Sequence, residues 1–220
     1  MIALVFALEY ESAALREPLR LCATVWHLGI TGRQCADPLE RHLKHTKPSL
    51  VVSAGFSGGL QPELTVGSLL IGENLSHSHI TRMFYSFPDF RFGKFITADC
   101  IVDTSSAKRT LGGTSGALAV DCESQYIRNI CDLYEVPMLA VRCISDTVDQ
   151  DLPVPGSILI NNSTGRPDPL GLFKYLLSHP ASIQGFRKMI RNSRIAQKAL
   201  ADGLSTLIPR LLKLAPIHGM

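Results

Sequence analysis

The sequence predicts an α/β fold, and two features carry that prediction. Short apolar runs of strand length alternate along the chain with longer segments of helical periodicity. Residues 117–146 hold the clearest unit: an apolar run, a helix with apolar positions at i, i+3, i+4 and i+7, and a second buried strand. We therefore expect two parallel strands here, joined by a right-handed helical crossover.

Composition indicates an ordinary globular domain. The chain has 220 residues, 45% of them hydrophobic, which suffices for a single domain over residues 1–220. The net charge of +3 is too small to predict a nucleic-acid partner. Six cysteines without a CxxC spacing argue against disulfides and structural zinc. The opening residues lack the basic region of a secretion signal, so we expect a cytoplasmic protein.

In chain order, the first half predicts strands and helices that alternate. Strands are expected over residues 2–8, 22–30, 49–53 and 66–71, with helices over 12–19 and ending near His45. Residues 53–60 (SAGFSGGL) predict a glycine-rich loop in which Phe56, Ser57 and Gly58 could approach a ligand, although a tight structural turn is the commoner explanation.

Further features follow along the chain. Residues 82–95 concentrate six aromatic side chains, which could wall an apolar substrate, form a subunit interface or simply cover the core. His77 and His79 lack a third metal ligand at suitable spacing. A strand over 95–102, a short helix interrupted by Gly112-Gly113, and a long loop after Asp146 follow. Residues 183–200 predict a basic amphipathic helix, either a solvated face or a contact with an anionic membrane.

Three acids fall where strands are expected to end. Glu11 follows the first strand, Glu123 follows the run at 117–120, and Ser145-Asp146 ends the strand that starts at Met138. Parallel strands would bring Glu123 and Asp146 to one carboxyl edge, where open α/β sheets bind ligands. Helix capping by Glu11 and a turn capped by Ser145-Asp146 are the plain structural alternatives.

Four motifs, in this order, resemble the nucleoside phosphorylase and nucleosidase superfamily: FALEYESAAL, SAGFSGGL with VGSLLIG, AVDCES and VRCISD. The match spans most of residues 2–150 and is nearest to the methylthioadenosine/S-adenosylhomocysteine nucleosidases. The resemblance implies a three-layer α/β/α fold with a mixed, partly barrelled sheet. It also implies a homodimer or larger assembly, no cofactor and no metal, and cleavage of a purine N-glycosidic bond.

Site residues carry over from that resemblance by position. Asp146 matches the acid that protonates the purine at N7, and Glu11 matches the carboxylate that orients the attacking water. Glu123 matches the glutamate that holds the ribose hydroxyls, and Cys122 stands where a methionine is usual. The backbone that reads the adenine edge falls at Ile101 and Val102, and Phe56 departs from the small residue usual in the glycine loop.

The chemistry suits these residue types. A purine leaves poorly as an anion, so it needs a proton, and we expect Asp146 to be an acid kept neutral by burial. We expect hydrolysis rather than phosphorolysis, with Arg33 as the basic residue that would favour phosphate.

A weaker resemblance, in TSGALAVDCES, Leu152-Pro153 and DPLGLFKYLLSHP, is to the hopanoid-associated phosphorylases, whose substrate would be a lipid-linked adenosine. A non-catalytic storage or nucleoside-binding protein of the same fold is the other alternative.

Overall fold

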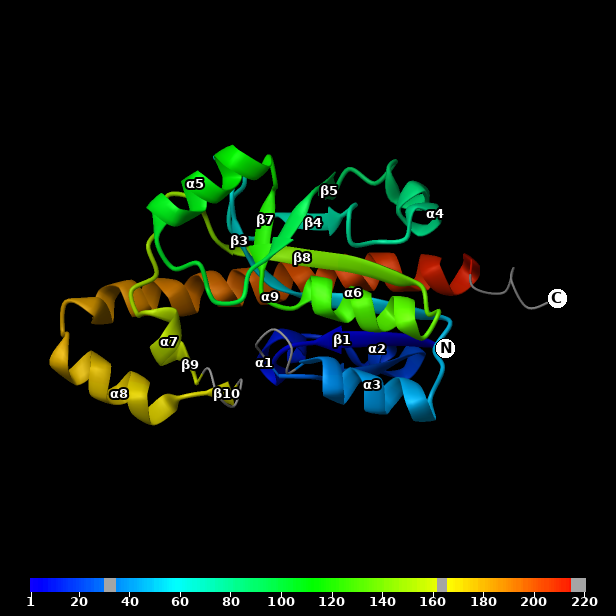
Figure 1. The fold of residues 1–220 in the computed structure, drawn as a ribbon, viewed down its shortest axis with the longest axis horizontal. Coiled ribbons are helices and arrows are strands. Elements are labelled where there is room, and N and C mark those ends of the chain that lie inside the picture. The colour runs from blue at the N-terminus through cyan, green and yellow to red at the C-terminus, as the bar shows by residue number, and fades with distance from the viewer. Residues whose placement is uncertain (30–34, 162–165, 215–220) are drawn as a thin grey trace.

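The computed structural model describes residues 1–29, 35–161 and 166–214, and in them a mixed sheet lies between two layers of helices (Figure 1). The predicted three-layer α/β/α class is confirmed. The sheet contains β1 (Ile2–Phe6), β2 (Ala23–His27), β3 (Leu50–Gly59), β4 (Leu69–Gly72), β5 (Phe90–Gly93), β6 (Phe95–Thr97), β7 (Ala119–Asp121) and β8 (Met138–Asp146).

The helices cover both faces of this sheet. They are α1 (Glu9–Ser12), α2 (Glu17–Cys22), α3 (Ala36–His45), α4 (Ser78–Thr81), α5 (Ser105–Ser115), α6 (Ser124–Leu133), α7 (Gly156–Leu159), α8 (Pro169–Ser178) and α9 (Ser182–Leu214), with a 3-10 turn over Arg82–Phe84. The short strands β9 (Ile160–Asn161) and β10 (Arg166–Pro167) form a separate pair beside α7 and α8.

The sheet closes on itself, which gives the partly barrelled shape that the resemblance implied. Its main order is β2-β1-β3-β8-β4-β5, and β7 pairs with both β3 and β6. Only Lys94 separates β5 from β6, so residues 90–97 pair with β4 at one end and with β7 at the other. The pairings β3-β8-β4-β5/β6-β7-β3 therefore form a ring of mixed strand direction.

Two apolar cores lie on opposite faces of the sheet, because side chains alternate along each strand. On one face, α9 packs Ala196, Leu200, Leu204 and Leu207 against β8, β3 and β4. On the other, α3 and α6 supply Leu39, Leu43, Ile127 and Cys131. In Figure 1, α9 runs along the back of the sheet while α3 and α6 lie in front of it.

Residues 53–60 do not form the predicted loop. They continue β3, which pairs in parallel with β8 as far as Gly58 and then with β7 through Gly58 and Gly59. The register shifts between Ser57 and Gly58, so the strand bends there instead of ending. Local turn propensity was outweighed by pairing with strands that lie far away in the sequence.

The predicted parallel crossover over residues 117–146 is also wrong. β8 runs parallel to β3, whereas β7 runs antiparallel to β3 and does not pair with β8. The carboxyl ends of β7 and β8 nevertheless meet, because Val120 and Asp146 are both register partners of Gly58. The strands converge on one residue of β3 from different directions, and this convergence brings the acids that follow them together.

Two smaller expectations need correction. The helix expected over 12–19 is two short helices, and α2 has Pro18 in its first turn, a position that suits proline. The Gly112-Gly113 pair lies inside α5 rather than interrupting it. A Cβ at Gly112 would lie 2.3 Å from the carbonyl oxygen of Leu60, so glycine lets α5 pack directly on that backbone.

The aromatic segment 82–95 mostly covers the core. Phe84, Phe90 and Phe95 are buried, and Phe87 packs against that core beneath the Arg210 guanidinium, 3.8 Å from its ring centroid. This segment does not line the large cavity described below. Within a single chain, this segment therefore does not wall the ligand pocket, contrary to that expectation.

Candidate active site

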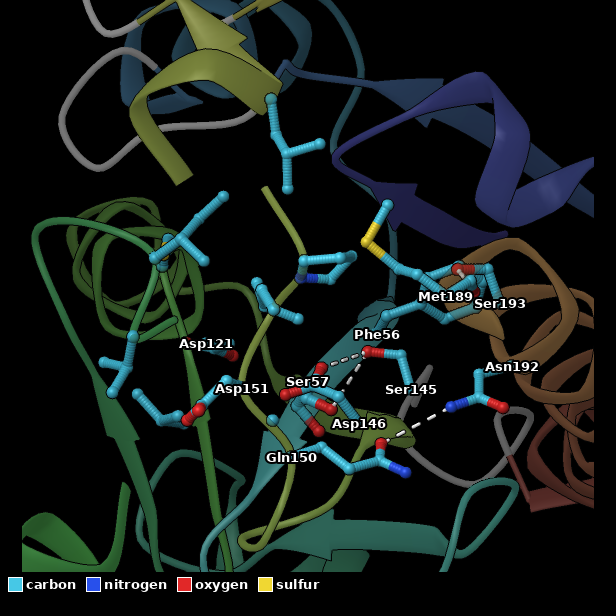
Figure 2. A pocket seen from close by; sticks show the side chains of 18 of the residues that line it. Phe56, Ser57, Asp121, Ser145, Asp146, Gln150, Asp151, Met189, Asn192 and Ser193 are labelled. Atoms are coloured by element: carbon cyan, nitrogen blue, oxygen red, sulfur yellow. Dashed lines mark hydrogen bonds between the residues drawn. The ribbon is translucent and has the colours of Figure 1, made fainter. Parts of the chain in front are cut away.

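A cavity of about 520 Å³ lies where β7 and β8 converge on β3, a size typical of small-molecule sites. The loop 147–153 and the first half of α9 complete its walls (Figure 2). All ten residues proposed from the sequence line it: Glu11, Phe56, Ser57, Gly58, Ile101, Val102, Cys122, Glu123, Ser145 and Asp146.

Asp146 ends β8, and both of its carboxylate oxygens have a donor. The Ser145 hydroxyl donates to Oδ1 at 2.8 Å, and the Lys108 ammonium contacts Oδ2. The Asp146 side chain is 16% exposed, on the cavity side, whereas the Lys108 side chain is fully buried behind it. These partners suit a carboxylate rather than a carboxylic acid. The buried ammonium of Lys108 is a partner that the expectation of an acid kept neutral by burial did not include.

Glu11 is held by backbone donors. It lies in α1, buried against β3, and its carboxylate accepts hydrogen bonds from the N–H groups of Leu8 at 2.9 Å and Phe56 at 2.8 Å. A Cβ at Gly55 would lie 2.8 Å from Glu11 Oε1, so glycine at that position allows this contact. Burial raises the pKa of Glu11, and the hydrogen bonds from Leu8 and Phe56 oppose that rise.

Glu123 follows β7 and precedes α6, and it too is buried at the cavity. Burial, followed by the nearby charge of Asp121, raises the pKa of Glu123 to about 8, and Glu11 adds to the rise. Two buried carboxyl groups thus disfavour each other's ionised forms. Beside them, burial raises the pKa of the Cys122 thiol, so Cys122 contributes a neutral side chain to the wall.

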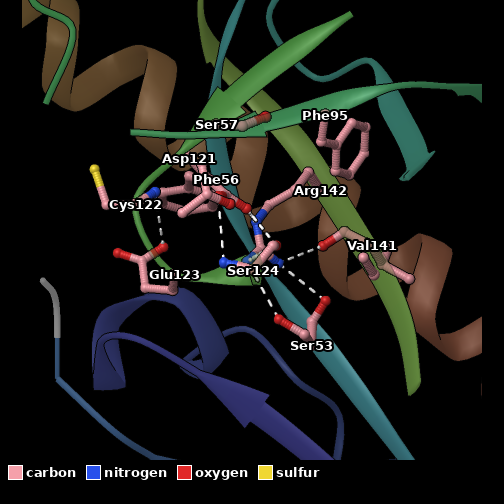
Figure 3. A network of polar contacts seen from close by, with 12 residues as sticks. Ser53, Phe56, Ser57, Phe95, Asp121, Cys122, Glu123, Ser124, Val141 and Arg142 are labelled. Carbon is pink, nitrogen blue, oxygen red and sulfur yellow. Dashed lines mark hydrogen bonds and ion pairs between the residues drawn. The ribbon is translucent and has the colours of Figure 1, made fainter. Parts of the chain in front are cut away.

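The neighbouring acid, Asp121, has a structural role. Its carboxylate accepts from Arg142 Nε at 2.8 Å, from the Thr97 hydroxyl at 2.8 Å and from the Ser124 hydroxyl (Figure 3). Arg142 also donates to the Ser53 carbonyl at 2.9 Å and to Ser124 Oγ at 2.7 Å, wholly inside the protein. This network joins β3, β7, β8 and the start of α6, and so positions Glu123.

Ser57, Ile101 and Val102, three more of the residues proposed from the sequence, also line the cavity. The hydroxyl of Ser57 is buried and has no hydrogen-bond partner among the described residues, so it can bond to a ligand. Ile101 and Val102 lie in the segment between β6 and α5, because the strand expected over residues 95–102 ends at Thr97. A Cβ at Gly156 would lie 2.7 Å from Ile101 Cβ, which shows how closely α7 packs on this part of the wall.

The sequence reading missed Lys108 and the residues that α9 contributes. Lys108 lies one helical turn before Gly112, so the two share the face of α5 that packs on the sheet. That spacing is the only available signal, since lysine usually points to water. From α9, Met189, Asn192 and Ser193 line the cavity, and Asn192 Nδ2 lies 3.4 Å from Gln150 Oε1.

Glu123→Gln is expected to flatten the dependence of stability on pH. Because the folded pKa of Glu123 lies above the ordinary value of 4.5, the folded chain holds more protons than the unfolded chain between about pH 4.5 and 8. Stability is highest below that window and falls by up to about 1.4 kcal/mol per pH unit as the pH rises through it. Urea unfolding from pH 5 to 9 measures this slope.

The exposed Glu63→Gln variant is the matched control for this measurement and should keep the wild-type slope. An unchanged slope in Glu123→Gln would contradict the raised pKa.

Residues 1–29, 35–161 and 166–214 lack two features that would indicate other classes of protein. None of the helices described there is long and apolar enough to cross a membrane. The same residues contain no group of three or more histidines, cysteines or acids arranged to hold a metal ion.

The closed mixed sheet and its two helical layers form a nucleoside phosphorylase-like fold, the fold of nucleosidases of known structure. Solved structures of nucleosidases share it over almost the whole chain. No family model matches the sequence.

Three of these structures illustrate the likeness. The 5′-methylthioadenosine/S-adenosylhomocysteine nucleosidase of Helicobacter pylori, as a mutant with 5′-methylthioadenosine in its active site, matches with a TM-score of 0.66 at 13% identity, covering 95% of this chain and 98% of its own. The S-adenosylhomocysteine nucleosidase of Streptococcus pyogenes gives 0.62 at 14%, covering 94% and 96%. The futalosine hydrolase of Helicobacter pylori gives 0.64 at 13%, covering 95% and 97%.

Proposed function

We propose that this protein hydrolyses the N-glycosidic bond of a purine nucleoside, with a 5′-modified adenosine as the substrate. The observation that carries the proposal is the meeting of Glu11, Glu123 and Asp146 at one cavity of ligand size. Solved nucleosidases of this fold bind such compounds, including 5′-methylthioadenosine. A non-catalytic nucleoside-binding protein would need neither an acid that gives a proton to the base nor one that activates water, so the presence of Asp146 and Glu11 beside Glu123 favours the enzyme.

Each acid has a separate role in this proposal. Asp146 passes a proton to N7 of the purine, which lets the base leave as a neutral molecule. Glu11 accepts a proton from the water that attacks C1′, and Glu123 holds the ribose hydroxyls. Ile101 and Val102 lie along the base, and the free hydroxyl of Ser57 bonds to the sugar or to the water.

The electrostatics of the cavity fit a cationic transition state. Burial raises the pKa of Glu11 and of Glu123, so their ionised forms are costly in the ligand-free chain. As the glycosidic bond breaks, the ribosyl group gains positive charge between these carboxyl groups. A bound ribosyl group that carries positive charge therefore favours the ionised forms of both carboxyl groups, and these carboxylates stabilise the transition state more than the ground state.

Hydrolysis rather than phosphorolysis is favoured by the groups around Glu11. Phosphate binding needs backbone N–H donors or cations. Here the N–H groups of Leu8 and Phe56 already donate to Glu11, whose carboxylate would repel an anion. Among the described residues that line the cavity, Lys188 is the only cation. Arg33, the basic residue considered from the sequence, lies outside the described residues.

Purified protein given 5′-methylthioadenosine in water enriched in ¹⁸O is expected to release adenine and a ribose derivative that carries the label at C1′. The rate should be the same with and without inorganic phosphate. Chromatography with mass detection measures both products. Formation of a sugar 1-phosphate in proportion to added phosphate would contradict hydrolysis while leaving glycosidic cleavage intact.

The 5′ group of the substrate is proposed to be apolar and larger than a hydroxyl. The wall beyond the acids includes four apolar side chains, Leu152, Pro153, Leu159 and Met189, which take the place of the aromatic segment first considered for this role. A thioether or alkyl group fits such a surface. The homodimer and the cytoplasmic location remain predictions.

A lipid-linked adenosine is the second candidate substrate, and the surface of α8 favours it. Leu170, Phe173 and Leu177 share one face of this helix and are 62%, 60% and 68% exposed. Next to it in the chain, α9 exposes Arg187, Lys188 and Arg191. Lys188 also lines the cavity, so this apolar and basic surface adjoins the site. Such a combination suits an anionic membrane.

Vesicles of an anionic phospholipid are expected to bind the wild-type protein and to bind Phe173→Ser with Leu177→Ser more weakly. Each basic residue near the surface adds about 1 kcal/mol. Co-sedimentation measures binding, and Leu133→Ser, which removes an equally exposed leucine from α6, is the matched control. Equal binding by all three proteins, with a strong preference for 5′-methylthioadenosine over a long-chain 5′-alkyl adenosine, would leave only the small substrate.

A further inference from the structure

Lys108 differs from every other lysine of the described chain in being fully buried. Burying an ammonium is costly unless it is paired and hydrogen-bonded. Its Nζ contacts Asp146 Oδ2 and donates to the carbonyl oxygens of Gln150 at 2.9 Å and Thr147 at 3.3 Å. The helix α5 therefore places this lysine against the one acid of the cavity that faces the leaving base in the proposed function.

The hydrogen-bond count around Lys108 has a chemical consequence. An ammonium has three donors, and here they meet one carboxylate and two carbonyls. A neutral amine has two donors, which would still satisfy the two carbonyls. The surroundings of Lys108 are thus matched both to the ammonium and to the amine that remains after a proton has moved to Asp146.

We propose that Lys108 is the source of the proton that Asp146 delivers to the purine. In this step an N–H bond of Lys108 breaks as an O–H bond of Asp146 forms, and that O–H bond breaks as N7–H forms. The electron pair of the C1′–N9 bond goes to the base. The attacking water gives its proton to Glu11, which later loses it to solvent, and Lys108 regains a proton from solvent.

The arrangement of the residues supports a relay from behind the acid. Lys108 is not among the residues that line the cavity, whereas Asp146 is, so Asp146 separates the ammonium from the ligand space. Ser145 holds the other carboxylate oxygen at 2.8 Å and so orients the carboxylate. A buried ammonium that already has three partners has no donor left for the substrate, and it can act only through Asp146.

This inference rests on the proposed function, and the experiment separates the two. The rate of adenine release from 5′-methylthioadenosine is measured for wild type, Lys108→Met and Lys108→Arg across pH 5 to 9. Arginine keeps the positive charge and the pairing with Asp146 but does not give up its proton. Both variants are expected to lose activity on the order of a hundredfold at neutral pH.

The pH profile supplies the readout that a purely structural role would not give. In Lys108→Met, Asp146 has to take its proton from solvent, so the remaining activity should rise steadily as the pH falls. Arg109→Met is the matched control, because Arg109 is the next residue of α5 and pairs with Asp149 at the surface, 2.7 Å away. This control should behave as wild type.

Wild-type rates in Lys108→Arg would overturn the relay and leave Lys108 as a positioning charge. A loss in Lys108→Met that is the same at every pH would also overturn it. Absence of adenine release from the wild-type protein would instead overturn the proposed function. If Lys108→Met does not fold, Lys108→Arg and Lys108→Gln carry the same comparison, with circular dichroism confirming the folded fraction.

Discussion

Asp146→Asn is expected to lower the release of the purine base on the order of a hundredfold or more, because an amide has no acidic proton to give to N7. The carboxamide keeps the size of the side chain and can still accept a hydrogen bond from Lys108. It no longer neutralises that buried ammonium, so the variant should also be less stable than wild type. Circular dichroism measures the folded fraction and chromatography measures the free adenine released, so that rates are compared per folded molecule.

The matched control for this prediction is Asp149→Asn. Asp149 also lines the cavity, but its side chain is 62% exposed and pairs with Arg109 at the surface. We expect this variant to keep wild-type turnover. Wild-type turnover in Asp146→Asn, or equal losses in both variants, would remove Asp146 from the mechanism.

Arg142→Met should be the most destabilising single change, with a loss of about 3–5 kcal/mol in the free energy of unfolding. The guanidinium is buried and joins Asp121, Ser53 and Ser124, so its removal leaves the Asp121 carboxylate without its positive partner. Urea denaturation measures the loss. Arg16→Met, which breaks an exposed pair with Asp202, should cost less than about 1 kcal/mol.

The double variant Arg142→Met with Asp121→Asn should recover part of that loss, because it removes both buried charges. A double variant as unstable as the sum of the two single changes would mean that Arg142 acts through packing rather than through the ion pair.

The sequence alone predicted the parts of the fold that depend on local pattern. The apolar run at Ile2 and the stripe of Ile127 and Cys131 correctly marked β1 and α6, because burial on a face repeats with the period of the element. The ten proposed site residues all reached one cavity. The resemblance contributed their roles, since spacing alone does not distinguish Glu123 from Asp121.

The predictions that failed concern features that depend on contacts between residues far apart in the sequence. The glycines at 55, 58 and 59 favoured a loop, yet pairing with β8 and β7 holds them in β3. The direction of β7 is set by the same pairing, so the parallel crossover was wrong although the acids met. Lys108 was missed because a buried lysine is recognisable only from the carboxylate and carbonyls that surround it in space.

The most direct measurement of the central claim is the amount of free adenine that the purified wild-type protein releases from 5′-methylthioadenosine, followed over time by chromatography. Our account predicts catalytic turnover, with adenine and the sugar product formed in equal amounts and far in excess of the protein. Binding of 5′-methylthioadenosine and of other purine nucleosides without release of the free base would contradict it.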